Sequence, residues 1–230
     1  RLPHYCKPEF AEDAVLSVNQ LYHPLIPNAT ANDLTLTRGS LLITGSNMSG
    51  KSTFIKTLNL NAITAQVLNT AFATTCTSRV WRFATSVNLQ DDLESGASYY
   101  LAEVQRIGEL MEYAAAPGLP YMLTIDEVFK GTNTIERIAA AKAVLAYLAE
   151  QDALVLVSTH DLELADLLAD TYELYHFQES VGTTDLSFDY KIKPGVMTER
   201  NAVRLLQICG YPDVVVAEAT RIAGKYGVDQ

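Results

Sequence analysis

Basic residues and long apolar runs are both scarce in this chain, and each scarcity excludes a class of protein. The 230 residues hold 17 Lys and Arg against 27 Asp and Glu, a formal net charge of −10. Because phosphate contacts need clustered Lys and Arg, this segment is not expected to grip nucleic acid over a broad surface. No apolar run approaches the roughly 18 residues that a membrane-spanning helix needs, so no membrane contact is expected.

Cysteine is also rare, with Cys6, Cys76 and Cys209 far apart in the sequence and odd in number. They form neither a metal-binding spacing nor a disulfide framework, which favours a reducing, cytoplasmic location. The chain begins at Arg1 without a Met or a signal pattern, so we expect a fragment of a longer protein. With 48% apolar and 19% charged residues, the composition is typical of a globular domain with a substantial core.

Residues 45–53 read GSNMSGKST and match the phosphate-binding pattern G-x-x-x-x-G-K-[ST]. Glycines let the backbone fold around a phosphate, and the N-terminus of the helix that follows favours anions. Within this loop, Lys51 can reach the outer phosphates and the hydroxyl of Ser52 can bind Mg²⁺. The context fits, since 41–44 reads as a short buried strand and 53–68 as a helix. The alternative is an ordinary Gly/Ser turn between a strand and a helix.

Apolar strands alternate with amphipathic helices through the middle of the chain. Strands are predicted at 33–38, 41–44, 80–87, 121–125 and 153–157, and helices at 53–68, 98–114 and 133–150. Asn133, followed by Glu136 three residues later, is a suitable N-terminal cap for the last of these helices. Continuous apolar strands separated by helices favour a parallel sheet covered on both faces.

The two ends of the chain have a different pattern. The first thirty residues contain four prolines and are predicted to be loops with little helix. Residues 171–193 predict two more strands around Gly182. Two helices are predicted after them, the first capped by Thr198 and ended by Gly210, and the second opened by Pro212.

Polar residues follow the central strands at the point where ligands bind in open α/β sheets. Asp126 can hold Mg²⁺, usually through its waters, and Glu127 can polarise an attacking water. His160 can hydrogen-bond a terminal phosphate and sense its loss. The alternatives are a solvated helix cap for the acidic pair and a structural role for the histidine.

A further segment, 91–98, leads into a predicted helix through a Gly and Ser98. Ser98 is a good N-cap, and a Ser on a Gly turn at a helix start is also an anion site. Both roles can hold at once.

Together these segments make the chain resemble the C-terminal ATPase domain, domain V, of the MutS family of DNA mismatch-repair proteins. The resemblance runs from about Leu21 to the end of the chain. It is carried by 45–53, by Asp91-Asp92-Leu93 with Gly96 and Ser98, by Asp126-Glu127 with Gly131-Thr132, and by Ser158-Thr159-His160.

This resemblance implies a fold and a domain plan. The fold would be α/β, a P-loop NTPase of the ABC-ATPase type with a mainly parallel sheet flanked by helices. Residues 1–194 would form the ATPase domain, with 1–32 as an N-terminal lead-in. Residues 195–230 would form a C-terminal helical dimerisation element of the same domain.

The resemblance also implies that ATP and Mg²⁺ are the cofactors of a dimeric, DNA-coupled ATPase. Glu127, His160 and Lys51 would be catalytic, and Ser52 and Asp126 would hold the metal. The nucleotide would bind Gly45, Ser46, Asn47, Met48, Ser49, Gly50, Lys51, Ser52 and Thr53, with Ser98 reaching it in trans. A homodimer with composite ATP sites would follow, and DNA would bind regions outside this segment.

Several positions depart from the usual family pattern. Ser46 stands where Pro is usual, Ser49 where Gly is common, and Tyr99-Tyr100 where Thr-Phe is usual. The aromatic residue that often stacks on adenine is not evident, since 29–31 is an Ala-Thr-Ala run. The SNMS version of the loop and the segment 129–133 are similar to those of divergent bacterial relatives that act in recombination or other nucleic-acid transactions.

Two other kinds of protein remain as alternatives. An ABC-type ATPase module of another machine would carry an L-S-G-G-Q-type signature, which this chain lacks. A nucleotide-binding interaction module that barely hydrolyses ATP would not need Glu127 and His160.

Overall fold

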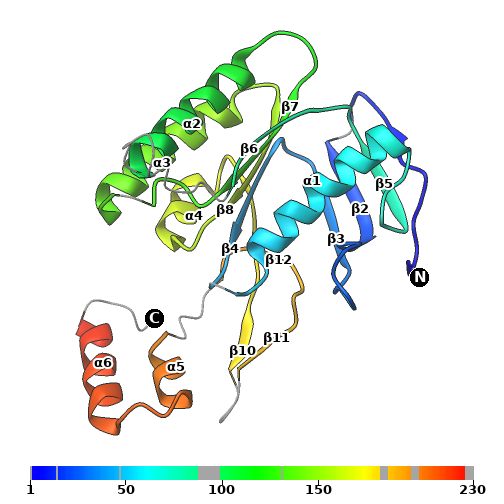
Figure 1. Cartoon of the computed structure of the whole chain (residues 1–230). Coiled ribbons are helices and arrows are strands. Elements are labelled where there is room, and N and C mark those ends of the chain that lie inside the picture. Colours follow the sequence, from blue (N-terminus) through cyan, green and yellow to red (C-terminus); the bar gives the residue numbers. More distant parts are fainter. Residues whose placement is uncertain are drawn as a thin grey trace.

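The computed structural model describes residues 2–13, 15–46, 48–87, 99–130, 132–181, 186–197 and 202–225. Helices cover both faces of a central sheet, and a second sheet lies beside it (Figure 1). The predicted α/β fold is therefore confirmed.

The central sheet has six strands in the order β12-β9-β4-β8-β7-β6. They are β4 (Ser40–Thr44), β6 (Arg82–Ser86), β7 (Tyr121–Asp126), β8 (Ala153–Ser158), β9 (Glu173–His176) and β12 (Lys193–Pro194). Every neighbouring pair from β9 to β6 is parallel, and β12 is antiparallel to β9. Because β4, β8 and β7 are adjacent and parallel, their carboxyl ends lie at one edge of the sheet.

Two hydrophobic cores, one on each face, hold this sheet between its helices. Helix α1 (Lys51–Leu68) covers one face, and α2 (Tyr99–Ala115), α3 (Thr134–Ala149) and α4 (Leu162–Leu168) cover the other (Figure 1). Within β4, Leu41 and Ile43 pack on the α1 side, whereas Leu42 packs with α2, α3 and α4. Burial on both faces explains why β4 and β8 are almost continuously apolar. The short helix α4 was not predicted from the sequence.

The second sheet has the order β1-β5-β2-β3 and lies against α1. Its strands are β1 (Glu9–Phe10), β2 (Leu16–Leu21), β3 (Asn32–Leu36) and β5 (Thr75–Ser78). The prediction of loops for the first thirty residues is therefore wrong at β1 and β2. In β2, Leu16 and Val18 are buried and alternate with Ser17, but this short alternation is hidden among prolines.

The C-terminal part contains a hairpin and two helices. Strands β10 (Glu179–Val181) and β11 (Leu186–Phe188) pair antiparallel, so the two strands predicted over 171–193 are in fact β9, β10, β11 and β12. Helices α5 (Ala202–Ile208) and α6 (Asp213–Lys225) confirm the two predicted helices. Gly210 follows α5 with φ of 75°, and Pro212 accepts the N–H of Val215 as α6 begins. The predicted cap Thr198 lies outside the described residues. In the part of the chain that the structure describes, no helix is long and apolar enough to cross a membrane.

Helix α3 begins with an N-terminal cap at Asn133, the residue predicted for this role. The side chain of Asn133 accepts the N–H of Glu136 at 3.0 Å, as predicted. Asn133→Ala should lower the free energy of unfolding by about 1 kcal/mol, the usual cost of losing an N-cap. Denaturant unfolding measures this change. Asn133→Ser keeps an acceptor and should be nearly neutral, and an equal loss in both variants would contradict the capping role.

Candidate nucleotide-binding site

The loop between β4 and α1 folds into a cradle that depends on its glycines. Gly45, Met48 and Gly50 have φ values of 146°, 74° and 110°. A Cβ on Gly45 would lie 2.7 Å from the carbonyl oxygen of Phe177, closer than real contacts allow. The first glycine is thus required by close packing as well as by its backbone conformation. Asn47, the third residue of the predicted loop, lies outside the described residues.

Lys51 lies within this cradle. It is only 4% exposed, and its Nζ donates to the carbonyls of Gly45 at 2.7 Å and Ser46 at 2.8 Å. Burial lowers the pKa of Lys51, while the nearby carboxylates of Glu127 and Asp126 act in the opposite direction. The ammonium group is therefore held by backbone carbonyls of the loop that it would serve.

Ser52, in the first turn of α1, contacts Asp126 at the end of β7. The Ser52 hydroxyl donates to Asp126 Oδ1 at 2.8 Å, and the Ser158 hydroxyl donates to the same oxygen. Both side chains offer oxygen donors, the ligand type that Mg²⁺ prefers, so Ser52 and Asp126 would hold Mg²⁺ together, Asp126 usually through its waters. Among the described residues, no cluster of three or more His, Cys, Asp or Glu could hold a metal. This donor set suits Mg²⁺, which keeps several waters and phosphate oxygens as ligands.

An unpaired buried hydroxyl adds to the fit for a phosphate. Ser49 is 1% exposed, and its Oγ has no hydrogen-bond partner within the described ranges. This Oγ lies 2.8 Å from the position of a Cβ on Gly45, so it faces across the loop. A buried polar atom without a partner is costly, and an anion or water in the cradle would satisfy it.

Glu127 and His160 form an ion pair at the ends of β7 and β8. His160 Nδ1 is 3.3 Å from Glu127 Oε1, and Lys130 Nζ is 2.9 Å from Glu127 Oε2. Glu127 has a φ of 62°, a strained value for a non-glycine residue. The hydrogen bond from His160 lowers the pKa of Glu127 to about 2, and the same contact raises the pKa of His160. The contact of Lys130 with Glu127 was not predicted from the sequence.

The chain after His160 is anchored to α3 by a second, more buried pair. Arg137 donates to Asp161 Oδ2 from Nε at 3.0 Å and to Oδ1 from Nη2 at 2.7 Å. Their side chains are only 14% and 9% exposed. This bidentate contact fixes the backbone beside His160, and bidentate pairs of this kind hold their geometry well.

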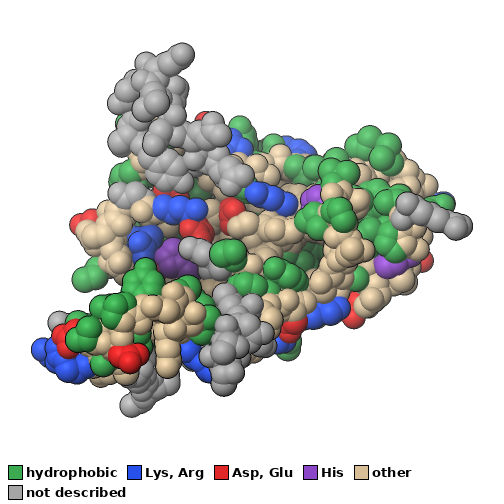
Figure 2. Space-filling model, turned by 60° about the horizontal axis from the view of Figure 1, so that its bottom comes forward, with side chains coloured by type: hydrophobic (Ala, Val, Ile, Leu, Met, Phe, Trp, Pro, Cys, Tyr) green, Lys and Arg blue, Asp and Glu red, His purple; other side chains and the backbone are tan. Residues whose placement is uncertain are grey.

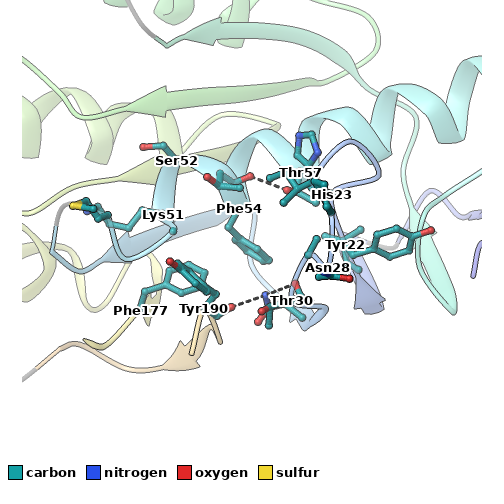
Figure 3. Close-up of a pocket in the computed structure, with 18 of the residues that line it drawn as sticks. Tyr22, His23, Asn28, Thr30, Lys51, Ser52, Phe54, Thr57, Phe177 and Tyr190 are labelled. Carbon is teal, nitrogen blue, oxygen red and sulfur yellow. Dashed lines mark hydrogen bonds between the residues drawn. The ribbon is translucent and has the colours of Figure 1, made fainter. Parts of the chain in front are cut away.

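A pocket of about 520 Å³ opens beside the loop on the α1 side. It is bounded by the loop, by the segment before β3 and by aromatic side chains that include Phe54, Phe177 and Tyr190 (Figure 3). Tyr190 is half exposed and can stack on a planar ring. Tyr190 was not predicted at this site, because it comes from the chain after β11 and lies far from the loop in sequence.

The structure therefore brings together most of the residues predicted for the site. Lys51, Ser52, Asp126, Glu127 and His160 meet at one edge of the sheet, as the contacts above describe. Thr53 lines the pocket with Met48 and Gly50. Ser98 and the segment 91–98 lie outside the described residues, and so does Gly131.

The chain is similar to known proteins over most of its length. The family model for MutS domain V matches residues 41–226. MutS protein homolog 4 of Homo sapiens is 32% identical over 238 residues, covering 96% of this chain and 25% of that protein. The DNA mismatch repair protein MutS of Natronomonas pharaonis is 29% identical over 232 residues, covering 96% of this chain and 26% of that protein. MutS of Lactobacillus delbrueckii is 32% identical over 231 residues. The chain thus spans about a quarter of the length of these relatives.

The Glu127–His160 pair predicts a pH dependence. The contact with Glu127 raises the pKa of His160, so protonated His160 stabilises the fold at low pH. This stabilisation is lost as pH rises through the raised pKa. The pKa of Glu127 is lowered, so its carboxylate stabilises the fold at pH values above the ordinary pKa of a glutamate. This stabilisation is lost as pH falls toward about 2. The pair is therefore strongest between about pH 4.5 and 6.5, from the ordinary pKa values of Glu and His.

Glu127→Gln removes the carboxylate, so the pKa of His160 should fall. An NMR titration of the His160 ring measures it, with His160→Gln used to assign the signal. Glu173 begins β9, at the edge of the sheet away from the site. The control variant Glu173→Gln should therefore leave the His160 titration unchanged. An unaltered His160 pKa in Glu127→Gln would show that the pair does not form in solution.

Proposed function

This chain belongs to the MutS family, and from that membership we propose that it is a P-loop NTPase of the ABC type that binds ATP with Mg²⁺ and hydrolyses it. One observation carries the proposal: Asp126 accepts hydrogen bonds from Ser52 of the loop and from Ser158 of β8. This contact joins the phosphate-binding loop to the strand ends that supply Glu127 and His160.

In this proposal the loop 45–53 binds the phosphates. Its N–H groups and Lys51 would face the phosphate oxygens and stabilise their negative charge. Ser52 and Asp126 would hold Mg²⁺, which when bound neutralises charge on the phosphate oxygens. The base would occupy the adjoining pocket, with Tyr190 stacking on its ring.

Glu127 would orient the attacking water. The hydrogen bonds from His160 and Lys130 lower the pKa of Glu127, so its carboxylate is ionised at neutral pH. An ionised carboxylate can accept a hydrogen bond from the attacking water, align it and polarise it. Its carboxylate now contacts Lys130 and His160, so at least one of these contacts must be exchanged for the water. His160 is half exposed and would then be available to the terminal phosphate.

We further propose a homodimer whose composite sites use Ser98 from the partner. Helix α6 has no buried residue, and it exposes Val214, Val215 and Ile222. Figure 2 shows hydrophobic side chains on the lower left of the surface, next to Lys, Arg, Asp and Glu side chains. A second copy of the element 195–230 would cover them, because contiguous exposed apolar surface usually marks an interface. DNA would bind regions of the full-length protein outside this acidic segment.

A nucleic-acid transaction other than mismatch repair is the second candidate. The observation that favours it is the loop sequence, with Ser46 and Ser49 in place of the more usual Pro and Gly. Turnover measured on the full-length protein with mismatched duplex and with branched DNA separates the two. Stimulation by branched DNA alone favours the second candidate.

The role of Glu127 makes a direct prediction. Glu127→Gln should retain Mg·ATP binding and lose turnover by roughly 100-fold or more, the scale of acid–base assistance. Phosphate release and nucleotide titration measure the two quantities separately. Retained turnover would remove Glu127 from the role of orienting the water.

The role of Ser98 makes a prediction that depends on assembly. Ser98→Ala should lower turnover only under conditions where the protein dimerises, because the hydroxyl acts on the partner's nucleotide. Turnover measured across protein concentration, with the mass in solution determined in parallel, tests this. An equal loss in a demonstrated monomer would assign Ser98 to helix capping alone.

A further inference from the structure

A buried carboxylate lies against the phosphate-binding loop and has no part in the proposed chemistry. Glu179, the first residue of β10, is 3% exposed, and it accepts a hydrogen bond from the Ser46 hydroxyl. Burying a carboxylate is costly unless donors satisfy it.

The chain just before Glu179 also touches the start of the loop. Phe177 N donates to the carbonyl of Thr44 at 3.0 Å, which extends the pairing of β9 with β4. The carbonyl oxygen of Phe177 lies so close to Gly45 that no Cβ fits between them. The first two residues of the loop are thus fixed by the backbone of Phe177 and by the side chain of Glu179.

The chain after the hairpin touches the other end of the loop. A Cβ on Gly50 would lie 3.3 Å from Tyr190 Cδ1, and the Tyr190 and Phe177 rings lie together below Lys51 in Figure 3. Asn32 holds this segment, since its Nδ2 donates to Tyr190 O at 3.0 Å and its Oδ1 accepts from Ile192 N at 2.9 Å. The chain therefore contacts the phosphate-binding loop both before and after the β10–β11 hairpin.

We propose that Glu179 is a positioning residue for the phosphate-binding loop and acts through the hydroxyl of Ser46. The carbonyls of Gly45 and Ser46 are the acceptors of the Lys51 ammonium, so fixing Ser46 also fixes Lys51. This inference rests on the proposed function, in which that loop and lysine bind phosphate. It adds a residue more than a hundred positions away that sets their geometry.

Charge repulsion is the competing role for Glu179, and it has the opposite sign. A carboxylate that only repelled phosphate would weaken nucleotide binding, so its removal would tighten binding. A positioning carboxylate would do the reverse, because its removal frees the loop. In addition, only positioning makes the effect of Glu179 depend on Ser46.

A double-mutant cycle on nucleotide affinity tests the proposal. The probe is a fluorescent N-methylanthraniloyl ATP with Mg²⁺, titrated into wild type, Ser46→Ala, Glu179→Ala and the double variant. Each single change should weaken binding about tenfold, and the double variant should be no weaker than the weaker single, because contacting residues are coupled. Ser46→Thr keeps the hydroxyl and should restore most of the affinity. Additive losses, unchanged affinity or tighter binding would overturn the proposal.

A second measurement needs no nucleotide. Amide hydrogen exchange over residues 45–53 should be faster in Ser46→Ala and Glu179→Ala than in wild type, and near wild type in Ser46→Thr. Glu173→Gln is the matched control, since Glu173 accepts the N–H of Thr37 at 2.6 Å at the opposite end of β9. It should leave exchange in the loop unchanged.

The two measurements separate the possible failures. If wild type does not bind the probe, the proposed function fails, while loop exchange still decides whether Ser46 and Glu179 hold the loop. If exchange in the loop is unchanged in Ser46→Ala, the positioning role is wrong whatever the affinity. Should Glu179→Ala not fold, the comparison of Ser46→Ala with Ser46→Thr decides alone.

Discussion

The hydrogen bond from Ser52 to Asp126, at 2.8 Å, is the contact on which the rest of the site depends. It joins the first turn of α1 to the end of β7, although β8 lies between β4 and β7 in the sheet. Ser158, at the end of β8, donates to the same carboxylate oxygen and so fills that gap. One oxygen thereby fixes the relative positions of the three strand ends. The cradle, the ion pair of Glu127 and the pocket are all built on this edge.

The charged groups of the site bind other groups of the protein. Lys51 bonds to loop carbonyls, and Glu127 bonds to Lys130 and His160. The depressed pKa of Glu127 and the raised pKa of His160 both result from this pairing. A bound nucleotide would have to exchange these contacts for its own phosphates, water and metal. Such a site can change its internal contacts when the ligand changes, which is what a nucleotide switch requires.

The sequence predicted those parts of the protein that are local. The helix cap at Asn133 depends on residues within a few positions, and the apolar strands β4 and β8 are buried on both faces. Family membership followed from joint motifs and is confirmed. Contacts between distant segments were not predictable: 133 positions separate Ser46 from Glu179, and 158 separate Asn32 from Tyr190. Strand β2 was missed because its short alternation lies in a proline-containing stretch, and β1 was missed because it has only two residues, both exposed. The chemical roles of Lys51, Asp126, Glu127, His160 and Ser98 remain predictions.

The most direct test of the account is a crystal structure of the protein with a non-hydrolysable ATP analogue and Mn²⁺ in place of Mg²⁺, with the metal located by its anomalous scattering. The account predicts an anomalous peak between Ser52 Oγ and the Asp126 carboxylate, with the phosphates in the loop 45–53 and the base beside Tyr190. A peak elsewhere, or a nucleotide bound away from this edge of the sheet, would contradict it.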